Sequence, residues 1–256
     1  MSRLQLIRFS SLALLASIVL ITRGANASPI VYGAFPGATI DYVGVQEESS
    51  SDPGSGFFGA PTVAGDAMDF NPQAFAASSS GLNSDITDSN LQFMVTAHAN
   101  KGITAISFAE AGDTTLTGLA GQAQTTVGTI INAEIQELNI AGVLTPVSIN
   151  LPQVVMPFAP KGSFLLTIDG AGTKGWTGGA PVDLSAYGGQ VTKVGISLDN
   201  TLTAASVAGT SAFIQKKDAD ALVITVITGG RIPEPSSVVI AMIGAVLCGA
   251  IVRRRK

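Results

Sequence analysis

Residues 91–119 read LQFMVTAHANKGITAISFAEAGDTTLTGL and show the pattern that decides the fold of the chain. Apolar residues alternate with polar or small ones, and β-branched residues are frequent. A period of two with this composition is typical of half-buried β-strands. We expect strands over 91–99, 103–111 and 113–119, with a hairpin connection at Asn100-Lys101-Gly102.

The same pattern continues on both sides of this stretch. Further strands are expected over residues 39–46, 125–138, 147–151, 163–169, 191–206, 211–218 and 221–227. Residues 139–142, Asn-Ile-Ala-Gly, are typical of a second hairpin connection, although residues 131–142 could instead form a short helix.

Turn-forming residues separate most of these strands. Residues 49–56 and 76–90 are rich in Ser, Gly, Asp and Asn and are expected to be loops. Residues 182–189 are expected to hold a single helical turn with Asp183 as its N-cap. Short strands without a long amphipathic helix predict an all-β fold, a β-sandwich or jelly roll, in one domain over residues 28–230.

Charge is distributed unevenly along the chain. Residues 28–230 contain 6 basic and 17 acidic side chains, and therefore a net charge of −11. A protein that binds nucleic acid must neutralise phosphates, so this balance argues against a nucleic-acid partner. The only cysteine is Cys248, which excludes a disulfide, a cysteine-zinc site or a thiol nucleophile from residues 28–230.

The first 27 residues are organised as a signal peptide. Arg3 and Arg8 precede an apolar run that is predicted to be helical, and Ala25-Asn26-Ala27 form a small-x-small cleavage site. Signal peptidase would cleave there and leave Ser28 as the first residue. The alternative is an uncleaved signal anchor, for which the apolar run is short.

Residues 231–256 combine an apolar run with a basic end. Val238–Val252 contains 15 apolar residues, which as a helix would span about 22 Å of a hydrocarbon core of about 30 Å. Arg253, Arg254, Arg255 and Lys256 would hold this end in the cytoplasm. We therefore expect a C-terminal transmembrane helix in the inner membrane, with residues 28–230 exported.

Pro233-Glu234-Pro235, followed by the apolar helix and the terminal basic cluster, resembles the PEP-CTERM sorting signal of bacteria. The resemblance implies processing by exosortase, after which the protein is anchored at the cell surface or released, often into an exopolysaccharide layer. The alternative is a plain tail anchor that follows an ordinary proline linker.

Three stretches of the middle domain resemble planctomycete-type PEP-CTERM proteins. They are GAPTVAGDAMDFNP (59–72), ITAISFAEAGDTTLTG (103–118) and LDNTLTAASVAGTSAFIQKKD (198–218). This resemblance implies an exported β-sandwich and no particular biochemical activity.

Few residues of the middle domain suggest a reaction. His98 is the sole histidine, and a local hydrogen bond at a strand end is its expected role. The glycines of 54–59 match a dinucleotide fingerprint but lack its strand and helix, so a loop is expected.

Carboxylates are the most abundant reactive groups in the middle domain. Three pairs lie close in sequence: Glu134 with Glu137, Asp66 with Asp69, and Asp218 with Asp220. A glycosidase needs two carboxyls that face each other across a cleft, which spacing along a sequence cannot establish. The oxygens of residues 85–90 and 65–69 could alternatively bind calcium, although both segments lack a complete calcium-loop consensus, and no other cofactor is expected.

Three functions remain open at this point. The first is a non-catalytic, exported protein of the cell surface or extracellular matrix. The second is a carbohydrate-binding module that acts on exopolysaccharide, and the third is a carboxylate-based glycoside hydrolase. Trp176 is expected in a glycine-rich loop, where it either packs partly buried against the core or is exposed and stacks on a sugar ring. The second function requires the exposed alternative, with Tyr32, Tyr42 or Tyr187 exposed beside it.

Deletion of Val238–Lys256 is expected to convert the protein from membrane-associated to freely secreted, because it removes the apolar run and its basic stop. Fractionation of cells and medium, followed by immunoblotting, measures this change. An unchanged membrane fraction would contradict the prediction.

Glu234→Ala is expected to block maturation, as the resemblance to exosortase substrates implies. The mass of the C-terminal fragment of the native protein is the measurement. Normal maturation of this variant would argue against exosortase as the processing enzyme.

Overall fold

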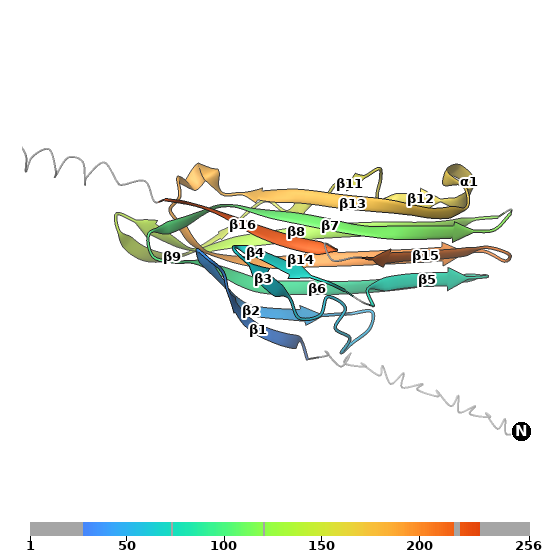
Figure 1. Ribbon diagram of the computed structural model, residues 1–256, viewed down its shortest axis with the longest axis horizontal. Coiled ribbons are helices and arrows are strands. Elements are labelled where there is room, and N and C mark those ends of the chain that lie inside the picture. Colours follow the sequence, from blue (N-terminus) through green and yellow to red (C-terminus); the bar gives the residue numbers. More distant parts are fainter. Residues whose placement is uncertain (1–27, 73, 120, 218–220, 231–256) are drawn as a thin grey trace, which may run out of the picture.

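The computed structural model describes residues 28–72, 74–119, 121–217 and 221–230, which form two antiparallel sheets. Sheet A contains β1 (Ile30–Pro36), β2 (Ile40–Glu48), β6 (Asn83–Ala97), β14 (Val191–Ser206), β8 (Ala123–Ile140) and β10 (Val154–Val155) in that spatial order, with β9 (Val143–Asn150) and β12 (Ser163–Leu165) also paired to β8. The long strands run along the long axis of the molecule (Figure 1).

Sheet B packs against sheet A. Its order is β11 (Phe158–Ala159), β13 (Gly172–Asp183), β7 (Lys101–Thr117), β16 (Leu222–Gly230), β4 (Ala67–Phe70) and β3 (Thr62–Ala64), while β15 (Ser211–Lys216) pairs with β7 and with β5 (Ala76–Ser80). One turn of helix, α1 (Leu166–Asp169), and one 3-10 turn, η1 (Ser185–Tyr187), complete the described elements. The all-β prediction is therefore confirmed in the form of two facing antiparallel sheets, and the jelly-roll topology stays a prediction.

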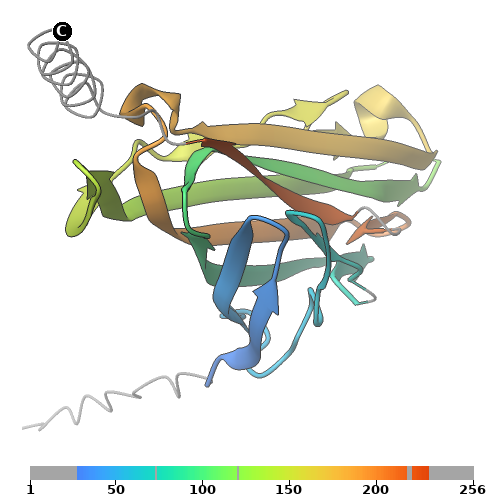
Figure 2. The same ribbon diagram turned by 60° about the vertical axis from the view of Figure 1, so that its left-hand side comes forward.

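Strand β14 lies in the middle of sheet A and has the bounds that the sequence predicts. It pairs with β6 on one side and with β8 on the other along nearly its whole length. Its alternate residues Ile196, Leu198 and Leu202 are buried in the layer between the sheets. This period of two fixes the register, because a slip by one residue would turn the apolar side chains to solvent. Strands β1 and β2 form one edge of this sheet and lie below the other strands in two views (Figure 1 and Figure 2).

The connection at Asn100-Lys101-Gly102 is not the predicted hairpin. Strand β6 belongs to sheet A and β7 to sheet B, so the chain crosses between the sheets at this point. A tight turn is present, since Asn100 has a φ of 63° and Lys101 N donates to His98 O at 3.1 Å. The tight turn was therefore predicted correctly, but the pairing of β6 with β7 was not, because each of these strands pairs with neighbours in its own sheet.

The connection at residues 139–142 is a hairpin, as predicted. Ile140 and Val143 pair across it, and Ala141 and Gly142 have φ values of 54° and 82°. Two central residues with positive φ are typical of the type I′ turn, whose twist matches that of the flanking strands. The alternative helix over 131–142 is wrong, because β8 continues to Ile140 and its alternate residues enter the core.

Several other sequence predictions need correction. Strands 103–111 and 113–119 are one strand, β7, and residues 163–169 divide into β12 and α1. The expected loop at 76–90 contains β5 and the first half of β6. The predicted turn within 182–189 is present as η1, but its N-cap is Leu184 and not Asp183, and no side-chain hydrogen bond caps it. Asp183 is the last residue of β13, and its Oδ1 accepts a hydrogen bond from Ser185 N at 2.8 Å.

A glycine of β7 makes room for its two neighbouring strands in sheet B, β13 and β15. Gly112 pairs with Trp176 of β13 and with Lys216 of β15. A Cβ at Gly112 would lie 2.1 Å from Gln215 O and 2.3 Å from Trp176 Cζ2. The buried indole and the neighbouring strand therefore require glycine at this position.

Gly112→Ala is expected to lower the free energy of unfolding by about 1–3 kcal/mol, because the added methyl group must displace backbone and indole. Gly128→Ala on β8 is the matched control, since its Cβ would meet nothing within 4 Å. The control is expected to change stability by less than about 1 kcal/mol. Urea unfolding monitored by circular dichroism measures both, and equal midpoints would contradict the prediction.

Candidate functional site

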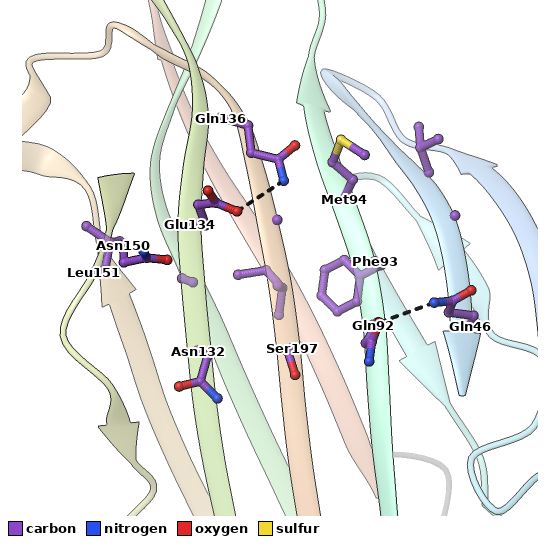
Figure 3. A pocket seen from close by; sticks show the side chains of 15 residues that line it. Gln46, Gln92, Phe93, Met94, Asn132, Glu134, Gln136, Asn150, Leu151 and Ser197 are labelled. Atoms are coloured by element: carbon purple, nitrogen blue, oxygen red, sulfur yellow. Dashed lines mark hydrogen bonds between the residues drawn. The ribbon is translucent and has the colours of Figure 1, made fainter. Parts of the chain in front are cut away.

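A hollow of about 590 Å³ opens on the outer face of sheet A (Figure 3). Five of the side chains that line it are carboxamides: Gln46, Gln92, Asn132, Gln136 and Asn150. They lie on strands β2, β6, β8 and β9, and on the first three of these strands they alternate with buried residues. The same period of two that builds the core therefore places these amides on the opposite face of the sheet.

Strand register aligns the polar side chains in a row across the sheet. Gln46 lies opposite Gln92, and Ser197 lies opposite Gln92 on one side and Asn132 on the other. Directly opposed side chains in a sheet have Cβ atoms about 5 Å apart. The row thus presents hydrogen-bonding groups at regular intervals across four strands.

Next to this row lies a position without a side chain. Gly195 of β14 is opposite Met94 on β6 and Glu134 on β8. A Cβ at Gly195 would lie only 2.8 Å from Gln136 Nε2, so the amide of Gln136 reaches over the glycine. Gly195 therefore deepens the hollow between the neighbouring side chains.

Irregular strand pairing lies on both sides of the hollow. The register between β2 and β6 shifts between Val43 and Gln46, where Gly44 has a φ of 65°. The register between β8 and β9 shifts between Ile135 and Glu137. Bulges of this kind bend a strand and redirect its side chains. The two irregularities therefore shape the outer face of sheet A around Gly195.

Hydrogen bonds join several of the polar side chains. Gln46 Nε2 donates to Gln92 Oε1 at 3.2 Å, and Gln92 Nε2 donates to Asn90 Oδ1 at 2.8 Å. Asn90 Nδ2 in turn donates to Ser197 Oγ at 2.9 Å. Gln153 Nε2 donates to Asn132 Oδ1 at 3.0 Å. These contacts orient the side chains before any ligand arrives.

Only one residue that lines the hollow is ionisable. Glu134 Oε1 accepts a hydrogen bond from Ser148 Oγ at 2.5 Å, and Gln136 Nε2 lies 3.5 Å from Glu134 Oε2. No lysine or arginine is among the lining residues. Two residues beyond Ser197, burial raises the pKa of Asp199, and the nearby negative charge of Asp88 raises it further. The site is thus neutral to acidic.

The chemistry of the site follows from the amides. A carboxamide both donates and accepts hydrogen bonds, as does a hydroxyl group. A sheet face with several oriented amides is suited to a ligand that is rich in hydroxyl groups. The single carboxylate of the lining does not provide the facing pair that glycoside hydrolysis requires.

The exposed aromatic platform that a carbohydrate-binding module would require is not formed by these rings, so that hypothesis loses their support, whereas the expected burial of Trp176 is confirmed. Trp176 lies in β13 and not in a loop, and it is 2% exposed. Tyr42 is fully buried and donates to Asp66 O at 2.8 Å, while Tyr32 donates to Glu47 Oε2 at 2.6 Å. These rings belong to different parts of the fold, because each follows the inward positions of its own strand or turn. None of them lines the hollow.

His98 has a local partner at the end of a strand, as expected. Its Nε2 lies 3.1 Å from Asp41 Oδ1, and both side chains are partly exposed.

Of the predicted carboxylate pairs, only Glu134 reaches the hollow. Glu137 accepts a hydrogen bond from Thr192 Oγ1 at 2.8 Å. Asp66 accepts one from Thr39 N at 2.7 Å, and Asp69 lies on β4. The pair Asp218 and Asp220 lies outside the described residues.

Two of the carboxylates proposed for calcium accept hydrogen bonds from the backbone of neighbouring segments, one from strand β5 and one from the loop after β2. Asp85 Oδ2 accepts from Ser78 N at 2.7 Å, and Asp88 Oδ1 accepts from Ser51 N at 2.6 Å. Among the described residues, His, Cys, Asp and Glu form no group of three or more that could hold a metal ion. Calcium binding therefore stays a prediction without an assigned site.

The residues assigned to the two predicted terminal signals lie outside the described part of the chain, with one exception. These are Ala25, Ala27, Pro233, Glu234, Pro235, Arg253, Arg254, Arg255 and Lys256. Ser28, at the predicted cleavage site, is the first described residue and is exposed. Within the described ranges, no helix has the length and apolar character needed to cross a membrane.

The sequence contains a signal for the hollow in the alternation of its polar residues. Polar residues occupy every second position in residues 90–92 and 132–136, within runs whose other residues are apolar. Amides clustered on the outer face of several strands can indicate a binding surface. Which strands lie next to each other, however, cannot be read from these runs separately.

Comparisons with known proteins show only distant likenesses. No protein-family model and no curated protein matches the chain. One similar solved structure is the enzymatically active domain of tailspike protein 4 of bacteriophage CBA120, with 10% identity and a TM-score of 0.19, covering 79% of this chain and 20% of that one. Another is the carbohydrate-binding module TmCBM61 in complex with β-1,4-galactotriose, with 10% identity and a TM-score of 0.19, covering 72% of this chain and 82% of that one. Likenesses at this level carry no argument about this chain.

Proposed function

We propose that the chain is an exported, non-catalytic protein that binds a neutral polysaccharide in the hollow on sheet A. The observation that carries this proposal is the row of oriented amides beside Gly195. Export, sorting by the C-terminal signal and a final position at the cell surface are part of the proposal, and they rest on the two terminal sequences.

The chemistry of the hollow favours a neutral glycan over a charged one. Its lining offers five amides and one carboxylate but no cation, so it cannot neutralise an acidic polymer. The net charge of −11 in residues 28–230 would also repel a polyanion. Because no exposed aromatic ring takes part, affinity must come from several hydrogen bonds, each contributing about 0.5–1.5 kcal/mol.

Binding of the full-length protein to a soluble β-glucan, a galactan and polygalacturonate is the test, measured by affinity electrophoresis and calorimetry. At least one neutral polymer is expected to bind, and polygalacturonate is expected not to bind. Gln92→Ala is expected to weaken binding about two- to tenfold, because one hydrogen-bonding group is lost.

Gly195→Leu is expected to abolish binding, because the new side chain fills the hollow. Gly175→Leu is the matched control on the exposed face of sheet B, where the nearest atom to a Cβ is Gly112 O at 3.9 Å. Binding by the Gly195 variant as strong as that of the wild type, or no binding of either neutral polymer by the wild type, would contradict the proposal.

A further inference from the structure

A lysine amine lies in the core of the protein. Lys216, the last residue of β15, has a side chain with no exposed surface, and its Nζ lies 2.7 Å from Glu110 Oε2. The side chain of Glu110, on β7, is also fully buried. A buried ion pair adds little net stability, because removing two charges from water offsets their attraction. The pair therefore calls for an explanation other than stability.

Aromatic rings surround the amine. Its Nζ lies 5.9 Å from the ring centre of Phe58, 5.6 Å from that of Phe75 and 5.7 Å from that of Trp176. Phe58 and Phe75 pack edge to face with their centres 5.1 Å apart. Cation–π contact can stabilise a charged amine, and the same rings exclude water from it.

The loop that carries Phe58 is fixed by a second buried carboxylate. Glu47 Oε1 accepts hydrogen bonds from Phe58 N at 3.0 Å and from Ser89 Oγ at 2.8 Å. Phe57 N and Tyr32 OH also donate to the Glu47 carboxylate. The aromatic enclosure is thus held in place on the side of sheet A and does not depend on Lys216 alone.

An asparagine of the opposite sheet joins this cluster. Thr129 Oγ1 lies 2.8 Å from Glu110 Oε2 and 2.9 Å from Asn200 Oδ1. Asn200 on β14 is fully buried, and its Nδ2 has no hydrogen-bond partner among the described residues. Glu110 Oε1 likewise has none. An unpartnered buried amide is costly, and a reaction that releases the amide nitrogen removes this cost.

We propose that Lys216 and Asn200 form an intramolecular isopeptide bond, with Glu110 as the group that transfers the proton. Lys216 Nζ attacks Asn200 Cγ, and a new Nζ–Cγ bond forms as the Cγ–Nδ2 bond breaks. The proton that leaves Nζ passes through the carboxyl of Glu110 to Nδ2, which departs as ammonia. Atoms and charge balance, and the step needs no oxidant or cofactor.

The surroundings favour this transfer at each step. Burial lowers the pKa of the Lys216 ammonium, although the charge and hydrogen bond of Glu110 oppose this effect. The neutral amine is the nucleophilic form, so desolvation promotes the attack. The Thr129 hydroxyl can donate to Asn200 Oδ1, where negative charge develops as Cγ becomes tetrahedral.

The bond would connect the two sheets of the sandwich. Asn200 belongs to β14 in sheet A and Lys216 to β15 in sheet B. Since residues 28–230 contain no cysteine, no disulfide can supply such a link. An isopeptide bond resists reduction, which suits an exported protein, and its formation does not depend on glycan binding.

Mass spectrometry of the purified, denatured full-length protein tests the inference. Trypsin cleaves after lysine, so Asn200 and Lys216 both fall in the peptide that begins at Val194. With the bond present, this peptide is expected to extend to Lys217, uncleaved after Lys216, and to be lighter by one ammonia. A peptide of unaltered mass that ends at Lys216 would overturn the inference.

A second digestion separates the cross-link from other reactions. Chymotrypsin cleaves after Phe213, between the two linked residues. The two pieces are expected to stay joined after this cleavage. Pieces that separate although ammonia has been lost would indicate a succinimide at Asn200. A loss of water together with a link to Glu110 would indicate a bond between Lys216 and Glu110. Either result would overturn the inference.

Variants test the assigned roles. Lys216→Arg and Asn200→Ala are each expected to abolish the ammonia loss, whereas the neighbouring Lys217→Arg is the control and is expected to retain it. Glu110→Gln is expected to leave most Lys216 free in a protein whose circular dichroism is unchanged. Full cross-linking of the Glu110 variant would overturn the role given to that carboxyl. Because the wild-type peptide decides whether the bond exists, a variant that fails to fold does not affect that answer.

Discussion

The layer between the two sheets is formed mostly by apolar side chains, because a polar group there loses its hydrogen bonds to water. Along β7, β8 and β14, every second residue enters this layer, and most of these residues are aliphatic or aromatic. The rule is broken where Glu110, Thr129, Asn200 and Lys216 enter the core from both sheets. Polar groups buried in this layer depend on hydrogen bonds to one another, because water cannot reach them. The exception therefore gathers a carboxyl, a hydroxyl, an amide and an amine into one cluster.

The outward face of sheet A carries many polar side chains. Side chains that alternate with the core point outward, and on β6, β8 and β14 many of them are amides or hydroxyls. Gly195 and the irregular pairings of β2 and β9 convert a part of this face into a hollow. The alternation of side chains along each strand thus accounts for both faces of sheet A. The inner face forms the apolar core and contributes to the buried polar cluster, and the outer face carries the proposed polysaccharide site.

Prediction from the sequence succeeded where the information was local. The bounds of β14 and the hairpin at Ala141 and Gly142 followed from alternation and from residues that tolerate positive φ. It failed for β13, where glycines around Trp176 indicated a loop. The glycines are needed there for close packing, since a Cβ at Gly178 would lie 2.6 Å from the ring of Phe158. A short sequence window cannot distinguish a glycine that turns the chain from one that makes room for a neighbour.

By itself, the sequence determined the strand periodicity, the acidic charge of residues 28–230 and the absence of cysteine from them, and it predicts the two terminal signals. These properties depend on residue identity and spacing along the chain. Tertiary structure decided that β6 and β7 lie in different sheets and that the amides of four strands share one hollow. It also decided that Lys216 meets Glu110, and that Thr129 connects Glu110 to Asn200. Each of these depends on which strands become neighbours. That choice is made by the packing of the whole core, because strands distant in sequence pair only when both of their faces find suitable surroundings.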